Sequence, residues 1–211
     1  MKLFLTSYAA HSLDKVVPLL GSSPKMLKVA FIPTASDAYR YRPWVDDDRQ
    51  MLLKLGFKVF QVGLQAQLSP DGFPVLDSKK NESELRMELA EADILFVGGG
   101  NTFYLLEQAQ KSGFLQIAKE MVEEGTIYIG SSAGSILAGP DIAPAEFFDD
   151  PSEANAQGTV GLGFVDFIIQ PHYDPTDPAF KQVQEKYKDE KFIPLDNSKL
   201  VFVDENGYKI I

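Results

Sequence analysis

Residues 126–138 read TIYIGSSAGSILA, and this stretch decides the fold. An apolar run rich in β-branched and aromatic residues is followed by small residues and then by a second apolar segment, which predicts a strand, a sharp turn and a helix. Gly130 and Gly134 flank Ser132 in the Gly-x-Ser-x-Gly spacing, where glycines permit a tight approach around a strained serine. Ser132 is therefore a candidate nucleophile, with an ordinary strand-to-helix turn as the alternative.

Composition narrows the class of protein. The 211 residues, 45% hydrophobic and 24% charged, predict a single domain over residues 1–211 with a full core. No run approaches the ~18 to 20 apolar residues of a membrane span, and the N-terminal segment is too short in its apolar part for a secretory signal, so we expect a cytoplasmic protein without a membrane partner. The net charge of −10 argues against a nucleic-acid partner. Without cysteines, the chain has no thiolate nucleophile or thiolate metal site, and we expect no metal or cofactor.

Strands and helices alternate along the first two thirds of the chain. Because the strands are short and continuously apolar, they fit a sheet that is buried on both faces. The pattern predicts an α/β fold with three layers, a mostly parallel sheet, helices on both faces, and a ligand site at the carboxyl ends of the strands. The predicted strands are 3–6, 28–32, 57–62, 94–97 and the apolar run that begins at 126, and the predicted helices are 43–55, 81–92, 103–112 and 115–124.

The remaining segments are less regular. Asn81, with Glu84 three residues later, predicts a capping box at the start of its helix. Turn-forming residues predict loops over 63–80 and 139–163, the latter on the surface. A strand over 164–169, a helix over 178–187 and a hairpin over 200–211 follow, and Asn206-Gly207 is the expected two-residue turn of the hairpin.

A serine hydroxyl needs a base within hydrogen-bond reach to become a good nucleophile. The chain has two histidines, His11 and His172. His172 follows a predicted strand of the same sheet as the strand before Ser132, and two strand ends in one sheet can bring these side chains together. His11 lies between a strand and a helix, where a turn or capping role is the simpler interpretation.

The base needs an orienting acid, for which the residues offer two candidates. Glu205 ends the predicted strand from Leu200, and Asp150 lies in the loop between the nucleophile and the base. Either order in the chain can give the same geometry. Asp141 and Asp149 are nearby carboxylates that we expect to be solvated.

An oxyanion hole needs two backbone amides that point to the developing charge. We expect one from Ala133, directly after the nucleophile, and one from Gly100 in the Gly98-Gly99-Gly100 turn. The same glycine turn can also form a phosphate nest. The complete Gly-x-Gly-x-x-Gly pattern and a Gly-Lys-Ser/Thr P-loop are both missing, which disfavours nucleotide binding.

Three blocks of sequence resemble the dipeptidase E (alpha-aspartyl dipeptidase) group of serine peptidases, peptidase family S51, which is related to cyanophycinase. The blocks are FVGGGNTF at 96–103, YIGSSAG at 128–134 and QPHY at 170–173. The resemblance implies a class I glutamine amidotransferase-like fold with serine in place of cysteine, and cleavage of the peptide bond after an N-terminal aspartate. It implies these roles: Ser132 as nucleophile, His172 as base, Gly100 and Ala133 as oxyanion donors, and Glu205 as acid, with Asp150 as the alternative acid.

One departure from the family pattern concerns specificity. Aspartyl dipeptidases of this family carry an arginine after the histidine block, suited to binding a carboxylate with two hydrogen bonds. This chain has no arginine after Arg86, and Lys181 or Lys186 can supply only a point charge. We predict a serine exopeptidase for dipeptides or short peptides, monomeric or homodimeric, with Asn101 and Lys181 in substrate binding. The alternative is a noncatalytic α/β domain that binds a nucleotide or small molecule.

Overall fold

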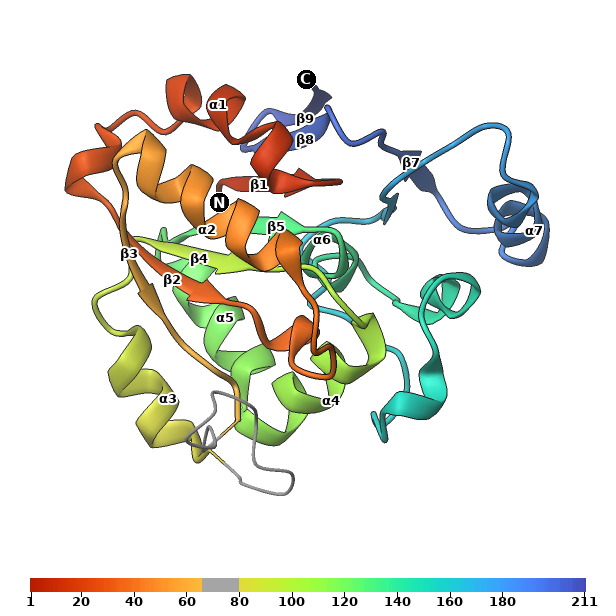
Figure 1. Ribbon diagram of the computed structural model, residues 1–211, viewed down its shortest axis with the longest axis horizontal. Helices are drawn as coiled ribbons and strands as arrows, with labels where there is room; N and C mark the ends of the chain where they lie inside the picture. Colours follow the sequence, from red (N-terminus) through yellow and green to blue (C-terminus); the bar gives the residue numbers. More distant parts are fainter. Residues whose placement is uncertain (66–79) are drawn as a thin grey trace.

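The computed structural model describes residues 1–65 and 80–211, and its centre is a seven-stranded sheet in the order β3-β2-β4-β5-β1-β8-β9 (Figure 1). Strands β1 to β5 run parallel, and β8 and β9 are antiparallel. The predicted mostly parallel sheet is confirmed. The strands are β1 Leu3–Thr6, β2 Lys28–Ile32, β3 Lys58–Gln61, β4 Ile94–Val97, β5 Ile127–Ser131, β8 Leu200–Asp204 and β9 Gly207–Ile210. Of the predicted loop 63–80, residues 66–79 lie outside the described residues.

Helices cover both faces of this sheet, as predicted (Figure 1). One face carries α1 Leu13–Val16 and α2 Pro43–Leu55; the other carries α3 Glu82–Leu89, α4 Thr102–Ser112, α5 Phe114–Glu123 and α6 Ala133–Leu137. The predicted capping box of α3 is present, since Asn81 Oδ1 accepts the Glu84 N–H at 2.9 Å and Glu84 Oε2 accepts the Asn81 N–H at 3.3 Å. None of the helices in residues 1–65 and 80–211 is long and apolar enough to cross a membrane.

The strands separate two apolar cores. Along β4, Ile94 and Phe96 face the core under α1 and α2, and Leu95 and Val97 face the core under α3 to α6. All four side chains are fully buried, and each such burial contributes about 1.5–3 kcal/mol relative to exposure. The continuous apolar run in this strand is therefore the consequence of two buried faces rather than one.

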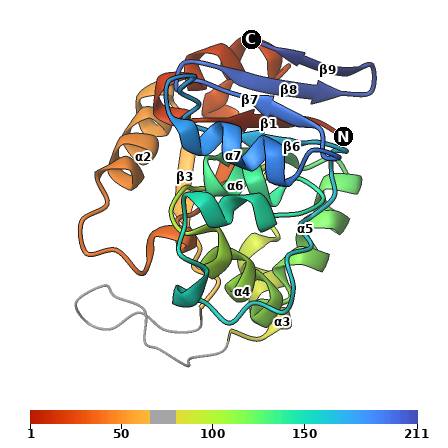
Figure 2. The same cartoon turned by 90° about the vertical axis from the view of Figure 1, so that its right-hand side faces the viewer.

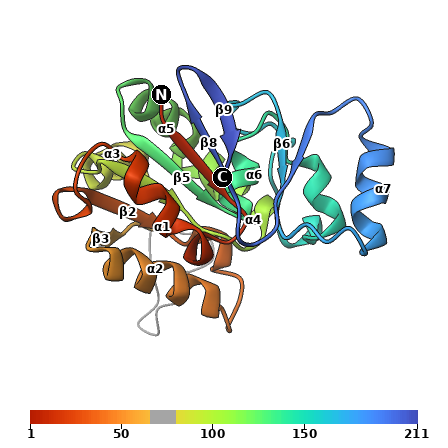
Figure 3. The ribbon, with the colours of Figure 1, turned by 90° about the horizontal axis from the view of Figure 1, so that it is seen from above.

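A second, two-stranded parallel sheet lies beside the main one (Figure 2). It consists of β6 Ile168–Gln170 and β7 Phe192–Pro194, which are joined through α7 Pro178–Lys186. Seen from above, α7 stands at the far edge of the molecule from α3 (Figure 3). Strand β6 is shorter and later than the predicted 164–169, and this small sheet was not predicted.

Two further predictions need correction. Asp204 pairs with Gly207, so the hairpin turn consists of Glu205 and Asn206 rather than Asn206 and Gly207. The segment 139–163 does not simply run over the surface, because it forms two 3-10 turns and buries Ile142 and Leu162 in the core under α3 to α6.

Candidate active site

Ser132 lies in a sharp turn between β5 and α6, with φ 49° and ψ −109°. This strained conformation fits the close packing of its neighbours. A Cβ on Gly130 would lie 2.7 Å from the carbonyl of Gly134, and a Cβ on Gly134 would lie 2.0 Å from the carbonyl oxygen of Val97. The Tyr128 hydroxyl donates to the Gly134 carbonyl at 2.7 Å, and this hydrogen bond links β5 to the first turn of α6. The spacing of the two glycines is thus a packing requirement.

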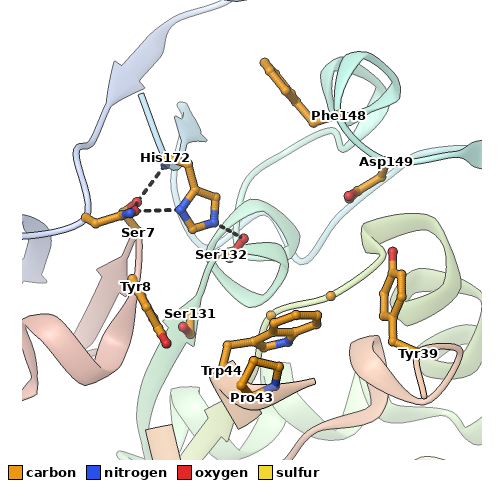
Figure 4. A pocket seen from close by; sticks show the side chains of 13 residues that line it. Ser7, Tyr8, Tyr39, Pro43, Trp44, Ser131, Ser132, Phe148, Asp149 and His172 are labelled. Carbon is orange, nitrogen blue, oxygen red and sulfur yellow. Dashed lines mark hydrogen bonds between the residues drawn. The ribbon is translucent and has the colours of Figure 1, made fainter. Parts of the chain in front are cut away.

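His172 approaches Ser132 from the turn after β6 (Figure 4). Its Nε2 lies 2.9 Å from the Ser132 Oγ, within hydrogen-bond distance. The backbone of His172 has φ 56°, an unusual value for a residue with a side chain. Its N–H donates to the Ser7 Oγ at 2.7 Å, and this contact fixes the turn to the end of β1.

The other ring nitrogen of His172 faces an amide. Asn197 Oδ1 lies 2.6 Å from His172 Nδ1 and also accepts the Ser7 hydroxyl at 2.9 Å. With the amide oxygen at this position, Nδ1 must carry the proton, and Nε2 is left as an acceptor for the Ser132 hydroxyl. Tautomer and amide orientation are assigned here from the hydrogen-bond network.

Strand direction explains why Asn197 occupies the place for which Glu205 was expected. Thr6 pairs with Ser131 in parallel β5 and with Leu200 in antiparallel β8. The residues before β8 therefore lie at the carboxyl edge of the parallel strands, beside Ser132. Glu205 follows the opposite end of β8, roughly 13 Å further along the strand, and is exposed there.

Asp150 also lies away from the Nδ1 atom of His172. Its side chain accepts the Ser152 N–H at 2.8 Å and caps a 3-10 turn, and its backbone carbonyl accepts the Asn101 amide at 3.0 Å. Asn101 itself is fully buried and caps α4 through the Tyr104 N–H. Its side chain is thus used for structure, and Lys181 is exposed on α7 outside the residues that line the cavity.

Two candidate oxyanion donors lie beside Ser132. Gly99 approaches so closely that a Cβ there would be 3.1 Å from the Ser132 Cβ. Gly100 has φ 139°, and a Cβ on it would lie 2.2 Å from the Ala35 carbonyl oxygen, so the position requires glycine. Within residues 1–65 and 80–211, the amides of Gly100 and Ala133 donate to no protein acceptor. Both remain available to a ligand.

These residues border a cavity of about 510 Å³. The aromatic side chains of Tyr8, Tyr39, Trp44 and Phe148 form much of its wall (Figure 4). Asp149 lines it too, and it is half-buried rather than solvated as we expected from the sequence. Burial raises the pKa of the Asp149 carboxyl, although hydrogen bonds from Thr102 oppose the shift.

A second carboxyl is buried beneath the turn at Ser132. Asp48 is 2% exposed; its Oδ1 accepts the Ala10 N–H at 2.7 Å, and the Ser131 hydroxyl also hydrogen bonds to it. Burial raises the pKa of Asp48 to about 7. No pattern in the sequence marked Ser7, Asp48 or Asn197, since each acquires its role from residues distant in the chain.

Comparison with known proteins identifies the family. The family model described as peptidase family S51 matches residues 3–211. The chain belongs to peptidase family S51. An uncharacterised peptidase of Pasteurella multocida is 30% identical over 214 residues, covering 100% of this chain and 96% of the relative. A peptidase E of Shewanella amazonensis is 30% identical over 168 residues, which cover 80% of this chain and 62% of the relative.

Solved structures show the same fold. A crystal structure from Listeria monocytogenes EGD-e, provisionally assigned as a peptidase E, has a TM-score of 0.86 and 26% identity, and the match covers 100% of this chain and 97% of that one. A peptidase from an acI-B1 Actinobacterium shares the fold at 16% identity, with a TM-score of 0.68 and coverage of 100% and 86%. The S51 chain is therefore a peptidase with the class I glutamine amidotransferase-like fold that the resemblance implied.

Proposed function

We propose that this S51 peptidase is a serine exopeptidase that hydrolyses dipeptides or short peptides. The 2.9 Å contact between Ser132 Oγ and His172 Nε2, at a strained turn that opens into a cavity, is the observation that supports it most strongly. Fold similarity alone would not distinguish a catalytic serine from a turn residue.

The reaction follows from the positions of these groups. Ser132 Oγ attacks the peptide carbonyl as His172 Nε2 takes its proton, and the amides of Gly100 and Ala133 donate to the oxyanion that forms. His172 then returns the proton to the leaving amine, so that the carbon–nitrogen bond breaks and an acyl-serine remains. Water, activated by the same imidazole, hydrolyses this ester and regenerates the serine.

Asn197 acts in this scheme as a positioning residue. Its amide oxygen keeps the Nδ1 proton in place, so that Nε2 faces Ser132, as a carboxylate would. An amide is neutral, however, and it stabilises the transient imidazolium less than a carboxylate would. We therefore assign the orienting role to Asn197 in place of Glu205 or Asp150.

The aspartate preference that the family resemblance implies has little support in this cavity. Among the described residues that line it, there is no lysine or arginine. The Arg42 guanidinium is already paired with Asp37 at 2.9 Å. We therefore include short peptides without an N-terminal aspartate among the substrates, and a dipeptide panel varied at the first residue tests this.

A fluorophosphonate probe with matched variants tests the central proposal. The wild type should be labelled on Ser132, and Ser132→Ala and His172→Ala should each lose about 10³-fold or more in turnover. His11→Ala serves as the control, because His11 is exposed and packs on Tyr8 at 4.3 Å between ring centroids. Retention of a tenth of the turnover by Ser132→Ala, with circular dichroism unchanged, would remove Ser132 from the nucleophile role. A folded protein that neither labels nor hydrolyses peptides would instead be a noncatalytic binding domain.

A further inference from the structure

The cavity has a carboxylate on the wall across from the catalytic pair. The carboxyl end of the Asp149 side chain faces the side of the cavity that Ser132 and His172 occupy (Figure 4). Tyr39 and Trp44 flank the same space, with their rings edge to face at 5.8 Å. The reaction described above makes no use of this carboxylate.

Within the described residues, only one oxygen of Asp149 accepts hydrogen bonds from the protein. Its Oδ2 accepts both the Thr102 N–H at 2.8 Å and the Thr102 hydroxyl at 2.5 Å, at the first residue of α4. The positive end of that helix favours the ionised carboxylate. In the part of the chain that the structure describes, no residue donates to Oδ1. The fixed oxygen orients the carboxylate, and the second oxygen is free to accept from a ligand.

The electrostatic surroundings of this wall select for a cation. The pKa of Tyr39 is raised by burial and then by the negative charges of three carboxylates, Asp149, Glu153 and Asp150. Burial and the charge of Glu153 also raise the pKa of Asp149. The described lining residues supply no lysine or arginine to balance these charges. A positive group beside Asp149 would gain a charge-assisted hydrogen bond and lie near aromatic rings. A carboxylate side chain at the same place would be repelled.

We propose that Asp149 binds the α-ammonium group of a peptide that enters the cavity with its free N-terminus, and that the aromatic wall receives an uncharged first side chain. This proposal rests on the proposed peptidase function and narrows its substrate class to peptides with an unblocked N-terminus. No bond forms or breaks at Asp149; the contact places the first carbonyl groups of the peptide near Ser132.

Kinetics on paired substrates test the contact. Phe-Leu-Leu and N-acetyl-Phe-Leu-Leu have the same residues, and acetylation converts the terminal ammonium to an uncharged amide that carries an acetyl group. Asp149→Asn should lose about 10- to 100-fold in kcat/KM on the free peptide, mainly through KM, and change less than about 2-fold on the acetylated one. The asparagine keeps an oxygen for Thr102, so capping of α4 is retained. Asp141→Asn is the matched control, because Asp141 also accepts a backbone N–H, that of Ala143 at 2.7 Å, away from the cavity.

Binding to Ser132→Ala provides a readout that does not depend on turnover. Calorimetry should show tighter binding of the free tripeptide than of the acetylated one, by about 10-fold or more, and Asp149→Asn in the same background should abolish the difference. Equal affinities for the two peptides would overturn the proposal, even if Ser132-dependent hydrolysis is observed. If no peptide is hydrolysed but the ammonium preference is present, the binding site stands and the peptidase proposal fails.

Discussion

Ser132 and His172, the proposed catalytic pair, are held in different ways. Ser132 is fixed by backbone packing, since Gly130, Gly134 and Val97 approach one another too closely for any added side chain. His172, by contrast, is exposed and depends on hydrogen bonds that it donates to side chains of distant residues. The turn that holds the proposed nucleophile is thus encoded in five adjacent residues, whereas the geometry of its proposed base depends on tertiary contacts.

The tightly packed turn around Ser132 should lose more stability from one added methyl group than the surroundings of His172 would. Gly134→Ala places its Cβ 2.0 Å from the carbonyl oxygen of Val97, a backbone atom that cannot move away easily. We expect a loss of about 4 kcal/mol or more in the free energy of unfolding, or failure to fold. Urea denaturation measures it. Gly63→Ala is the control, because the nearest atom to its Cβ would be 3.8 Å away, and an equal loss there would show that packing at the turn is not special.

The buried carboxyl of Asp48, under the turn at Ser132, should make the free energy of unfolding depend on pH. Because burial raises the pKa of Asp48 to about 7, the folded state keeps a proton that the unfolded chain releases near the ordinary aspartate pKa of 3.8. The free energy of unfolding should therefore fall as pH rises from about 4 to about 7, by on the order of 3 kcal/mol.

Asp48→Asn isolates this contribution. The amide can still accept the Ala10 N–H and has no charge to bury, so much of the pH slope should vanish and the variant should gain relative stability above pH 7. Asp37, whose pKa burial raises to about 6, contributes a similar slope in both proteins. Chemical denaturation at several pH values gives the slopes; identical slopes would exclude Asp48 as their source.

The hydrogen bonds that hold His172 are tested by substitutions near the two ends of β8. Asn197→Ala should lose about 100-fold in kcat, because His172 would no longer be held in its productive tautomer, whereas Glu205→Gln should stay within about 2-fold. Asn197→Asp should retain activity and move the acid limb of its pH–rate profile to higher pH, because a carboxylate favours the protonated ring. The reverse ranking of Asn197→Ala and Glu205→Gln would restore Glu205 as the orienting residue.

Removal of the Ser7 hydroxyl should have the smallest effect. Ser7→Ala deletes the acceptor for the His172 N–H and the donor to Asn197, and leaves the Nδ1–Oδ1 contact in place. We expect about a 10-fold loss in kcat with little change in KM, since a net hydrogen bond contributes roughly 0.5–1.5 kcal/mol. Thr6→Ser, one residue earlier on β1, is a matched control for small changes at this edge. A loss seen only in KM would argue that Ser7 contacts substrate instead.

The sequence predicted what is local. The alternation of strands and helices, the capping box at Asn81 and the turn around Ser132 each depend on neighbouring residues, and the structure contains all of them. The contact between His172 and Ser132 was expected from two strand ends in one sheet, and that part was wrong: the contact is present, but β6 belongs to the separate two-stranded sheet. The family resemblance added the overall fold.

The direction of β8 could not be predicted from its residues. An apolar run indicates a strand but not which of its ends lies at the site, so Glu205 was expected at the position that Asn197 occupies. Asp149 is a similar case: its acidity suggested a solvated side chain, and only its contact with Thr102 places it in the cavity wall. Such features depend on partners tens of residues away.

The two residues of the proposed catalytic pair follow strands of two different sheets. Ser132 follows β5 of the seven-stranded sheet, and His172 follows β6 of the two-stranded sheet, where Tyr173 is tied to Leu195 through a 3.0 Å backbone hydrogen bond. A misplacement of about 1 Å between reacting groups can cost on the order of 100-fold in rate. The rate of hydrolysis should therefore depend on the position of the two-stranded sheet relative to the seven-stranded sheet. During mild heating, hydrolysis should fade before the far-ultraviolet circular dichroism changes, because loosening of the small sheet separates the pair while both sheets persist.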